Sequence, residues 1–263
     1  MRKRREQMTT PFSKLPDELI SQIISLLPTP QDACRASAVS TSFRSIADSD
    51  QVWLKFLPLD HSDVILPQIS PMKSLYLHLC DHGVPVGGNR NTIFSLDKKS
   101  RKKCFLIGAR ELGILWGDNE NYWTRIVEPN SRFDQVAQLL VVWWFHIERR
   151  IDTKILSPKT RYAAYLIFRF NDYKEGFHRP VESRVSFESD GNREWPKVVL
   201  DPREGEPRST RERGDGWLEF EMGEFYNEDR DDGTLLCSLR EIDNHTPKRG
   251  LVVEGIEFRP KET

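Results

Sequence analysis

A chain of 263 residues is long enough for two domains, and its 30% charged and 38% hydrophobic residues are typical of a soluble globular protein. The formal net charge of −1 gives no general attraction to nucleic acids or membrane surfaces. No run approaches the roughly 18 apolar residues that a membrane span needs, and no apolar core follows the basic start, as a signal peptide would require. The four cysteines are scattered, which predicts reduced thiols. We therefore expect a cytosolic or nuclear protein.

The chain begins with the basic run Met1-Arg2-Lys3-Arg4-Arg5. Residues 1–13 are predicted to be a solvated, disordered terminus. Two functional interpretations of the basic run stay open, a nuclear address and a contact with phosphate.

Residues 14–57 are predicted to form a module of short helices. Pro16 suits the start of the first helix, where a missing N–H costs nothing, and the two acidic residues after it carry the charge that the helix dipole favours there. Thr29 and Pro30 have the pattern of an N-cap followed by a first-turn proline, which predicts a second helix. A third short helical run follows around Phe43.

The apolar residues of the first predicted helix form a stripe that is wide for so small a module. A cluster of about forty residues has little interior, because small domains bury a low fraction of their surface. Two interpretations stay open: part of the stripe is exposed for a partner protein, or the second half of the chain covers it. The stripe consists of Leu15, Leu19, Ile20, Ile23, Ile24, Leu26 and Leu27.

Residues 58–89 are predicted to be a connector with one short helix. Beyond it the pattern changes to short strands of period two, such as Arg161–Phe170 and Trp217–Met222, separated by turns. The apolar run Val141–Ile147 is too continuous to face solvent and is predicted to be a central strand buried on both sides. Because helices are nearly absent there, residues 90–263 are predicted to form an antiparallel β-sandwich. The predicted fold class is α+β.

Two tryptophans seven residues apart, Trp116 and Trp123, flank a polar turn. In a hairpin-like arrangement both indoles would sit at one end of the sandwich, where their flat faces could stack on a sugar ring. Asp118, Glu120 and Asn121 could then accept hydrogen bonds from sugar hydroxyls. The alternative is that both indoles belong to the hydrophobic core, and the pattern alone favours that alternative.

The helical module carries a series of short motifs in a fixed order. They are Leu15-Pro16, Glu18-Leu19-Ile20, Ile23-Ile24, Leu26-Leu27, Asp32-Ala33-Cys34-Arg35, Val39-Ser40, Ser42-Phe43 and Trp53. Together they resemble an F-box, a helical motif that docks on a Skp-type adaptor in cullin-based ubiquitin ligases. The resemblance implies that the adaptor is bound by Leu15, Pro16, Leu19, Ile20, Ile23, Ile24 and Leu27.

The second half of the chain carries another ordered set of motifs. They include Leu112-Gly113-Ile114-Leu115-Trp116-Gly117-Asp118, Tyr122-Trp123, Ser131-Arg132-Phe133, Leu156-Ser157-Pro158, Asp215-Gly216-Trp217 and Gly255-Ile256-Glu257. In this order they resemble the phloem protein 2 lectin domain, whose members bind N-acetylglucosamine oligomers or N-glycan cores. The resemblance implies a jelly-roll-like sandwich and a carbohydrate-binding role for Trp116 and Trp123. An F-box before such a domain is the layout of a plant subfamily.

The two resemblances predict a substrate-recognition subunit of a Skp-cullin-F-box type ubiquitin ligase, with a glycan, glycoprotein or other protein as target. Motifs of hydrolases, metalloproteases and phosphate-binding loops are absent from the sequence, so we predict a non-catalytic subunit without a cofactor. His78, Cys80 and His82 are one ligand short of a tetrahedral zinc site, and we predict no metal. Two other functions stay open, a free-standing intracellular lectin and an enzyme acting on glycans.

Overall fold

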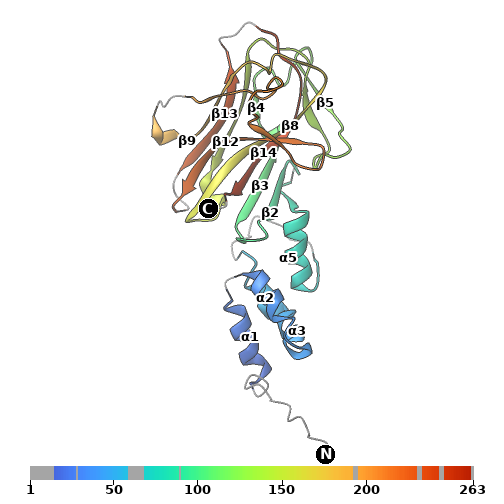
Figure 1. The fold of residues 1–263 in the computed structure, drawn as a ribbon, viewed down its shortest axis with the longest axis vertical. Helices are drawn as coiled ribbons and strands as arrows, with labels where there is room; N and C mark the ends of the chain where they lie inside the picture. The colour runs from blue at the N-terminus through green and yellow to red at the C-terminus, as the bar shows by residue number, and fades with distance from the viewer. Residues whose placement is uncertain are drawn as a thin grey trace, which may run out of the picture.

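The computed structural model describes residues 15–27, 29–58, 68–88, 90–191, 195–229, 233–242 and 246–261. The terminus predicted to be disordered, residues 1–13, lies outside the described residues. The fold class is α+β, as predicted: short helices precede two antiparallel β-sheets (Figure 1). None of the helices in the described part of the chain has the length and apolarity that crossing a bilayer requires.

The first four helices form the predicted module, and a fifth lies in the predicted connector. The N-cap predicted at Thr29 is confirmed: its hydroxyl accepts a hydrogen bond from the Asp32 N–H at 3.2 Å, and Pro30 is the first helical residue. Ser40 caps the next helix in the same way, accepting from the Phe43 N–H at 3.2 Å. The helices are α1 (Asp17–Ser25), α2 (Pro30–Ala36), α3 (Thr41–Ala47), α4 (Asp50–Leu54) and α5 (Met72–Asp81).

The helices and the sandwich share one hydrophobic core. Trp53 is 1% exposed, donates its indole N–H to the Ala47 carbonyl at 2.7 Å, and lies 5.3 Å from the Tyr76 ring of α5, centroid to centroid. The same helix also packs on β2, and Leu79 of α5 and Phe94 of β2 are buried. A continuous cluster of buried side chains therefore runs from the small helices through α5 into the sandwich.

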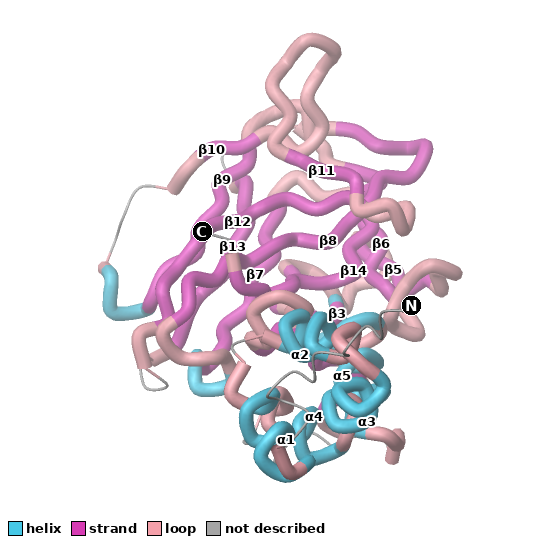
Figure 2. The backbone as a smooth tube through the Cα atoms, turned by 60° about the horizontal axis from the view of Figure 1, so that its bottom comes forward, coloured by secondary structure: helices cyan, strands magenta, loops and turns pink. Residues whose placement is uncertain are grey.

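The strands pair only antiparallel among the described residues, and they form a larger and a smaller sheet. The larger sheet has the order β1-β2-β3-β14-β8-β12-β11, with β6 pairing β14 and β5, and the smaller has the order β10-β9-β13-β7-β4. Figure 2 shows the helices gathered at one end of this sandwich. The larger sheet consists of β1 (Val84–Val86), β2 (Thr92–Leu96), β3 (Lys103–Gly108), β5 (Trp123–Ile126), β6 (Val136–Leu139), β8 (Thr160–Glu175), β11 (Thr210–Glu212), β12 (Leu218–Asn227) and β14 (Arg249–Pro260). The smaller sheet consists of β4 (Gly113–Ile114), β7 (Phe145–Asp152), β9 (Val181–Phe187), β10 (Lys197–Val198) and β13 (Thr234–Glu241).

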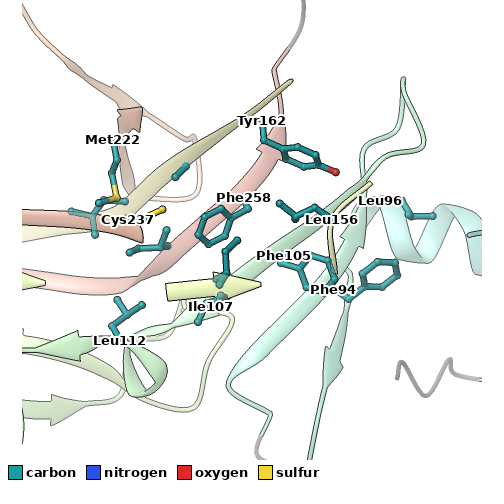
Figure 3. Close-up of a cluster of buried hydrophobic side chains, with 14 of the residues drawn as sticks. Phe94, Leu96, Phe105, Ile107, Leu112, Leu156, Tyr162, Met222, Cys237 and Phe258 are labelled. Atoms are coloured by element: carbon teal, nitrogen blue, oxygen red, sulfur yellow. The ribbon is translucent and has the colours of Figure 1, made fainter. Parts of the chain in front are cut away.

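The main core lies between the two sheets. Phe258 of β14, Met222 of β12 and Cys237 of β13 belong to it, and the Phe94 and Phe105 rings extend it toward α5 with their centroids 5.4 Å apart (Figure 3). Along β8, Leu166 and Phe168 belong to this core and Ile167 between them belongs to a separate buried cluster, so the strand alternates between its two faces as the period-two pattern predicts.

An ion network lies on the outer face of the larger sheet. Glu257 points outward because its neighbours in β14 point into the core, yet it is only 8% exposed. Arg213 Nη1 lies 2.7 Å from Glu257 Oε2, Arg259 Nη1 lies 2.9 Å from the same oxygen, and Arg132 Nη1 lies 3.6 Å from Oε1. Burial raises the pKa of Glu257, but these three guanidinium groups outweigh it and hold the pKa below its usual value.

Replacing Glu257 with glutamine should destabilise the fold at pH 7 by about 3 kcal/mol, because the arginines lose a buried counter-charge. A carboxyl pKa that is lowered in the folded state stabilises the fold above the unfolded pKa, and this stabilisation is lost as the pH falls through the folded pKa. The gap in thermal midpoint between wild type and variant should therefore shrink on acidification. Equal midpoints at neutral pH, or a gap that widens in acid, would contradict this account of the network.

Candidate functional site

The two tryptophans of the predicted sugar site lie at the two ends of the loop between β4 and β5, in different environments. The Trp116 side chain is 50% exposed. Trp123 is 3% exposed and belongs to the main hydrophobic core. The two indoles therefore do not form one surface platform. Trp116 presents its ring to solvent, whereas Trp123 lies in the hydrophobic core, which was the alternative interpretation of the sequence pattern.

The backbone at Trp116 is strained. Its φ is +62°, a left-handed conformation that bulky residues rarely adopt. The Gly117 N–H donates to the Ile114 carbonyl at 2.9 Å and closes a turn around it. A Cβ on Gly117 would lie 2.9 Å from the Ile114 Cβ, so the turn needs glycine there. Strain of this kind costs roughly 1–3 kcal/mol and is concentrated at functional sites, which marks this loop as a candidate.

An aromatic groove with a volume of about 240 Å³ lies beside this loop. Two of its indoles were not among the predicted site residues, Trp143 and Trp144, which are 48% and 53% exposed. The Trp116 and Tyr122 rings contact each other with centroids 5.9 Å apart. The aromatic groove is lined by Trp116, Tyr122, Val142, Trp143 and Trp144.

The prediction that Val141–Ile147 is a strand buried on both sides is wrong. β7 begins only at Phe145, and the chain before it is irregular. Val142 and Lys248 exchange backbone hydrogen bonds of 3.0 and 2.8 Å, which anchors the bend. Val142 and Phe145 therefore point inward, while the two tryptophans between them face solvent.

A buried ion pair stabilises the backbone that carries the tryptophans of the aromatic groove. Lys248 is fully buried, and its ammonium group pairs with Glu241, which is 7% exposed. The same ammonium group donates to the Trp143 carbonyl at 3.2 Å and to the Thr246 carbonyl at 3.1 Å. A buried cation is tolerated only when it is paired and hydrogen-bonded. Here these bonds also fix the backbone that carries the exposed indoles.

A polar cavity of about 530 Å³ opens at the same loop. Asp118 and Glu120 line it rather than the aromatic groove, and Asn121 lines neither. The Trp123 Nε1 and one Nη of Arg125 are buried at its wall without a hydrogen-bond partner among the described residues. Burial lowers the pKa of Arg125, and Arg110, which also lines the cavity, lowers it further. The loop thus combines apolar ring faces with donors and acceptors.

The F-box-like module leaves an apolar face open on α1. Leu19, Ile23 and Leu26 are 45%, 47% and 81% exposed, and their spacing puts them on one side of the helix. We call these three residues the α1 face. No described part of the sandwich covers it, and α1 lies at the end of the molecule away from the sheets (Figure 1).

The other residues of the predicted adaptor-binding set have several environments. Ile20 and Ile24 are 5% and 2% exposed and belong to the core of the module. Leu15 and Leu27 are partly buried against that core, and Pro16 is exposed. The predicted stripe is thus divided between the interior and the surface.

The residues considered as an incomplete zinc set are not arranged as ligands. The His78 and His82 rings contact each other with centroids 5.3 Å apart. Burial raises the pKa of the Cys80 thiol to about 11, which disfavours the thiolate that would bind a metal. Within the described ranges, no three His, Cys, Asp or Glu side chains cluster in a way that could hold an ion.

Both halves of the chain match known families. Residues 12–57 match the family model described as F-box-like, and residues 102–260 match the one described as Phloem protein 2. F-box protein PP2-B10 of Arabidopsis thaliana is 38% identical over 277 residues, which cover 98% of this chain and 98% of that protein. F-box protein PP2-B5 of the same plant is 37% identical over 261 residues, which cover 96% and 88%.

Two solved carbohydrate-binding modules are similar to the chain at low identity. A family 35 module from Clostridium thermocellum is 13% identical, covers 59% of this chain and 96% of its own, and has a TM-score of 0.34. The CBM22-1 xylan-binding domain of Paenibacillus barcinonensis Xyn10C is 10% identical, covers 70% and 95%, and has a TM-score of 0.32. The sequence matches are far stronger, since they span nearly the whole chain. The chain belongs to the phloem protein 2 family, in the plant group whose members carry an F-box before the lectin-like domain.

Proposed function

We propose that the chain is a substrate-recognition subunit of a Skp-cullin-F-box type ubiquitin ligase, and that its sandwich holds the target by a glycan. The observation that carries the proposal is the presence of two uncovered apolar surfaces, the α1 face and the aromatic groove. Figure 1 shows α1 at one end of the molecule and β4 and β5, which flank the groove loop, at the other. An adaptor and a target could therefore be bound at the same time.

The α1 face supports the adaptor half of the proposal. Burying a leucine or isoleucine side chain fully is worth about 1.5–3 kcal/mol, and these side chains still expose roughly half of their area or more. Pro16, Leu19 and Ile23 are then the contact residues among the predicted set, whereas Ile20 and Ile24 hold the helix in place from below.

The aromatic groove supports the glycan half. The exposed faces of Trp116 and Trp144 offer flat apolar surfaces for the C–H face of a sugar ring. The polar cavity at the same loop would bind the hydroxyl groups, with Asp118 and Glu120 as acceptors and Arg125 as a donor. We propose an oligosaccharide containing N-acetylglucosamine, the sugar class that the family resemblance implies.

The proposed mechanism is proximity. The other subunits of the ligase carry out the covalent chemistry, and this chain raises the effective concentration of the target beside them. In this mechanism the chain itself catalyses no step, and it acts in the cytosol or nucleus. The alternative function, a lectin acting without a ligase, would use the same groove but leave the α1 face without an adaptor.

Replacing Leu19 and Ile23 together with aspartate should abolish co-purification with a Skp-type adaptor, because two charges would have to be buried in an apolar interface. Affinity should fall about 1,000-fold, from two contacts worth about 2 kcal/mol each. The matched control is Val127→Asp, an equally drastic change at a side chain that is 73% exposed on the sandwich. If the adaptor stays bound to the double variant, or fails to bind the wild type, the receptor function is wrong.

Replacing Trp116 or Trp144 with alanine should weaken binding of chitooligosaccharides to the full chain by about tenfold each, the loss of one stacking surface. A glycan array followed by calorimetric titration would measure it. Tyr173→Ala is the control, since this ring is 81% exposed outside the aromatic groove. Unchanged binding in both tryptophan variants would exclude the groove as the sugar site. A wild type that binds no glycan would favour a protein target instead.

A further inference from the structure

A third cavity, of about 240 Å³, lies where the helical module meets the sandwich. Its walls come from the chain that follows α4, from the turn between β2 and β3, and from the residues just before β8. Four of the ten described residues that line it are basic and none of the ten is acidic. The basic residues are Lys55, Arg101, Lys102 and Lys103. We call this the junction cavity.

Three of these cations have no carboxylate partner in the part of the chain that the structure describes. The Lys55 ammonium donates to the Ser25 hydroxyl at 2.8 Å, and the Lys102 ammonium donates to the Pro158 carbonyl at 3.3 Å. The Arg101 guanidinium lies over the Phe56 ring, 5.4 Å from its centroid. Among the described residues, no carboxylate oxygen lies within 4.0 Å of any of the three.

Cations elsewhere in the same region are paired. Lys98, in the same turn as Arg101, lies 3.2 Å from Asp81, and Lys73 lies 2.6 Å from Asp48. The formal net charge of the whole chain is −1, so a general excess of positive charge does not explain the cluster. The lack of a carboxylate partner among the described residues is therefore a local property of Lys55, Arg101 and Lys102.

The turn between β2 and β3 holds this arrangement in place. Arg101 has a φ of +62°, and its N–H donates to the Asp97 carbonyl at 2.8 Å. The Asp97 carboxylate is the acid of this turn, but it accepts the Ser100 N–H and hydroxyl, each at 2.6 Å. Burial lowers the pKa of Lys102, and Arg101 lowers it further. The fold thus holds the like charges of Arg101 and Lys102 close enough to repel each other.

We infer that the junction cavity binds a small phosphate-type anion. Lysine and arginine donors that line one cavity without an acid among its lining residues are the chemistry that recognises phosphate oxygens. The volume lies below the roughly 300–1,000 Å³ of sites for larger ligands, which favours a compact anion such as pyrophosphate or a small phosphate ester. Since its walls come from both halves of the chain, the bound anion would fasten the helical module to the sandwich. This site is separate from the aromatic groove and the α1 face.

The test is thermal unfolding of the full chain in sodium pyrophosphate against sodium chloride of the same ionic strength. A ligand that binds only the folded state raises the midpoint, here by an expected 2–4 °C at about ten times the dissociation constant. The double variant Arg101→Ala with Lys102→Ala should lose the shift. Arg179→Ala removes an exposed cation outside the junction cavity and should keep it.

Without pyrophosphate the double variant should melt no lower than wild type, because neither Arg101 nor Lys102 has a carboxylate partner among the described residues. If it melts lower, calorimetric titration of the milder Lys102→Gln variant at low temperature replaces the melting test, with weaker pyrophosphate binding expected. A shift equal to that in sodium chloride, or a shift that survives in the double variant, would overturn the inference. Stabilisation by a phosphoserine peptide but not by pyrophosphate would also overturn the inference.

Discussion

The packing of α5 between the small helices and the sheet is the contact on which the whole arrangement depends. Helices of five to nine residues are not stable alone in water. Their core around Trp53 is closed by Tyr76 of α5, and α5 in turn covers Phe94 of the sheet. The F-box is therefore held in one orientation by a core that it shares with the sandwich. This orientation leaves the α1 face and the aromatic groove at opposite ends.

Local patterns in the sequence predict much of this fold. The N-cap at Thr29 and the period-two alternation of β12 depend on neighbours along the chain, and both are found in the structure. The fold class and the family also follow from local motifs in their order. For the wide stripe of the first helix the sequence left two interpretations open, and the structure buries Ile20 and Ile24 while leaving Leu19, Ile23 and Leu26 exposed.

The candidate site depends on contacts between distant segments, which is why the sequence predicts it only in part. Trp123 faces the core because β5 joins the sheet through β6 and β14, and a strand pattern does not specify that pairing. Trp143 and Trp144 are exposed because Lys248, about a hundred residues later, anchors the bend before them. The adjacency of the two tryptophans was the available signal that at least one is exposed. Successive side chains of a strand point to opposite faces, so a strand with one solvent-facing side cannot bury both.

The central claim is that one chain joins an adaptor at its helical end to a glycan-bearing target at its sandwich end. The most direct measurement is sedimentation of the full chain with a Skp-type adaptor and an albumin conjugated to chitooligosaccharide. We expect a ternary complex of chain, adaptor and conjugate. Free chitotriose should compete with the conjugate and release it, while the adaptor stays bound to the chain. The affinity of the chain for each partner should not depend on whether the other is bound. Displacement of the adaptor by the conjugate, or equal binding of unconjugated albumin, would contradict the account.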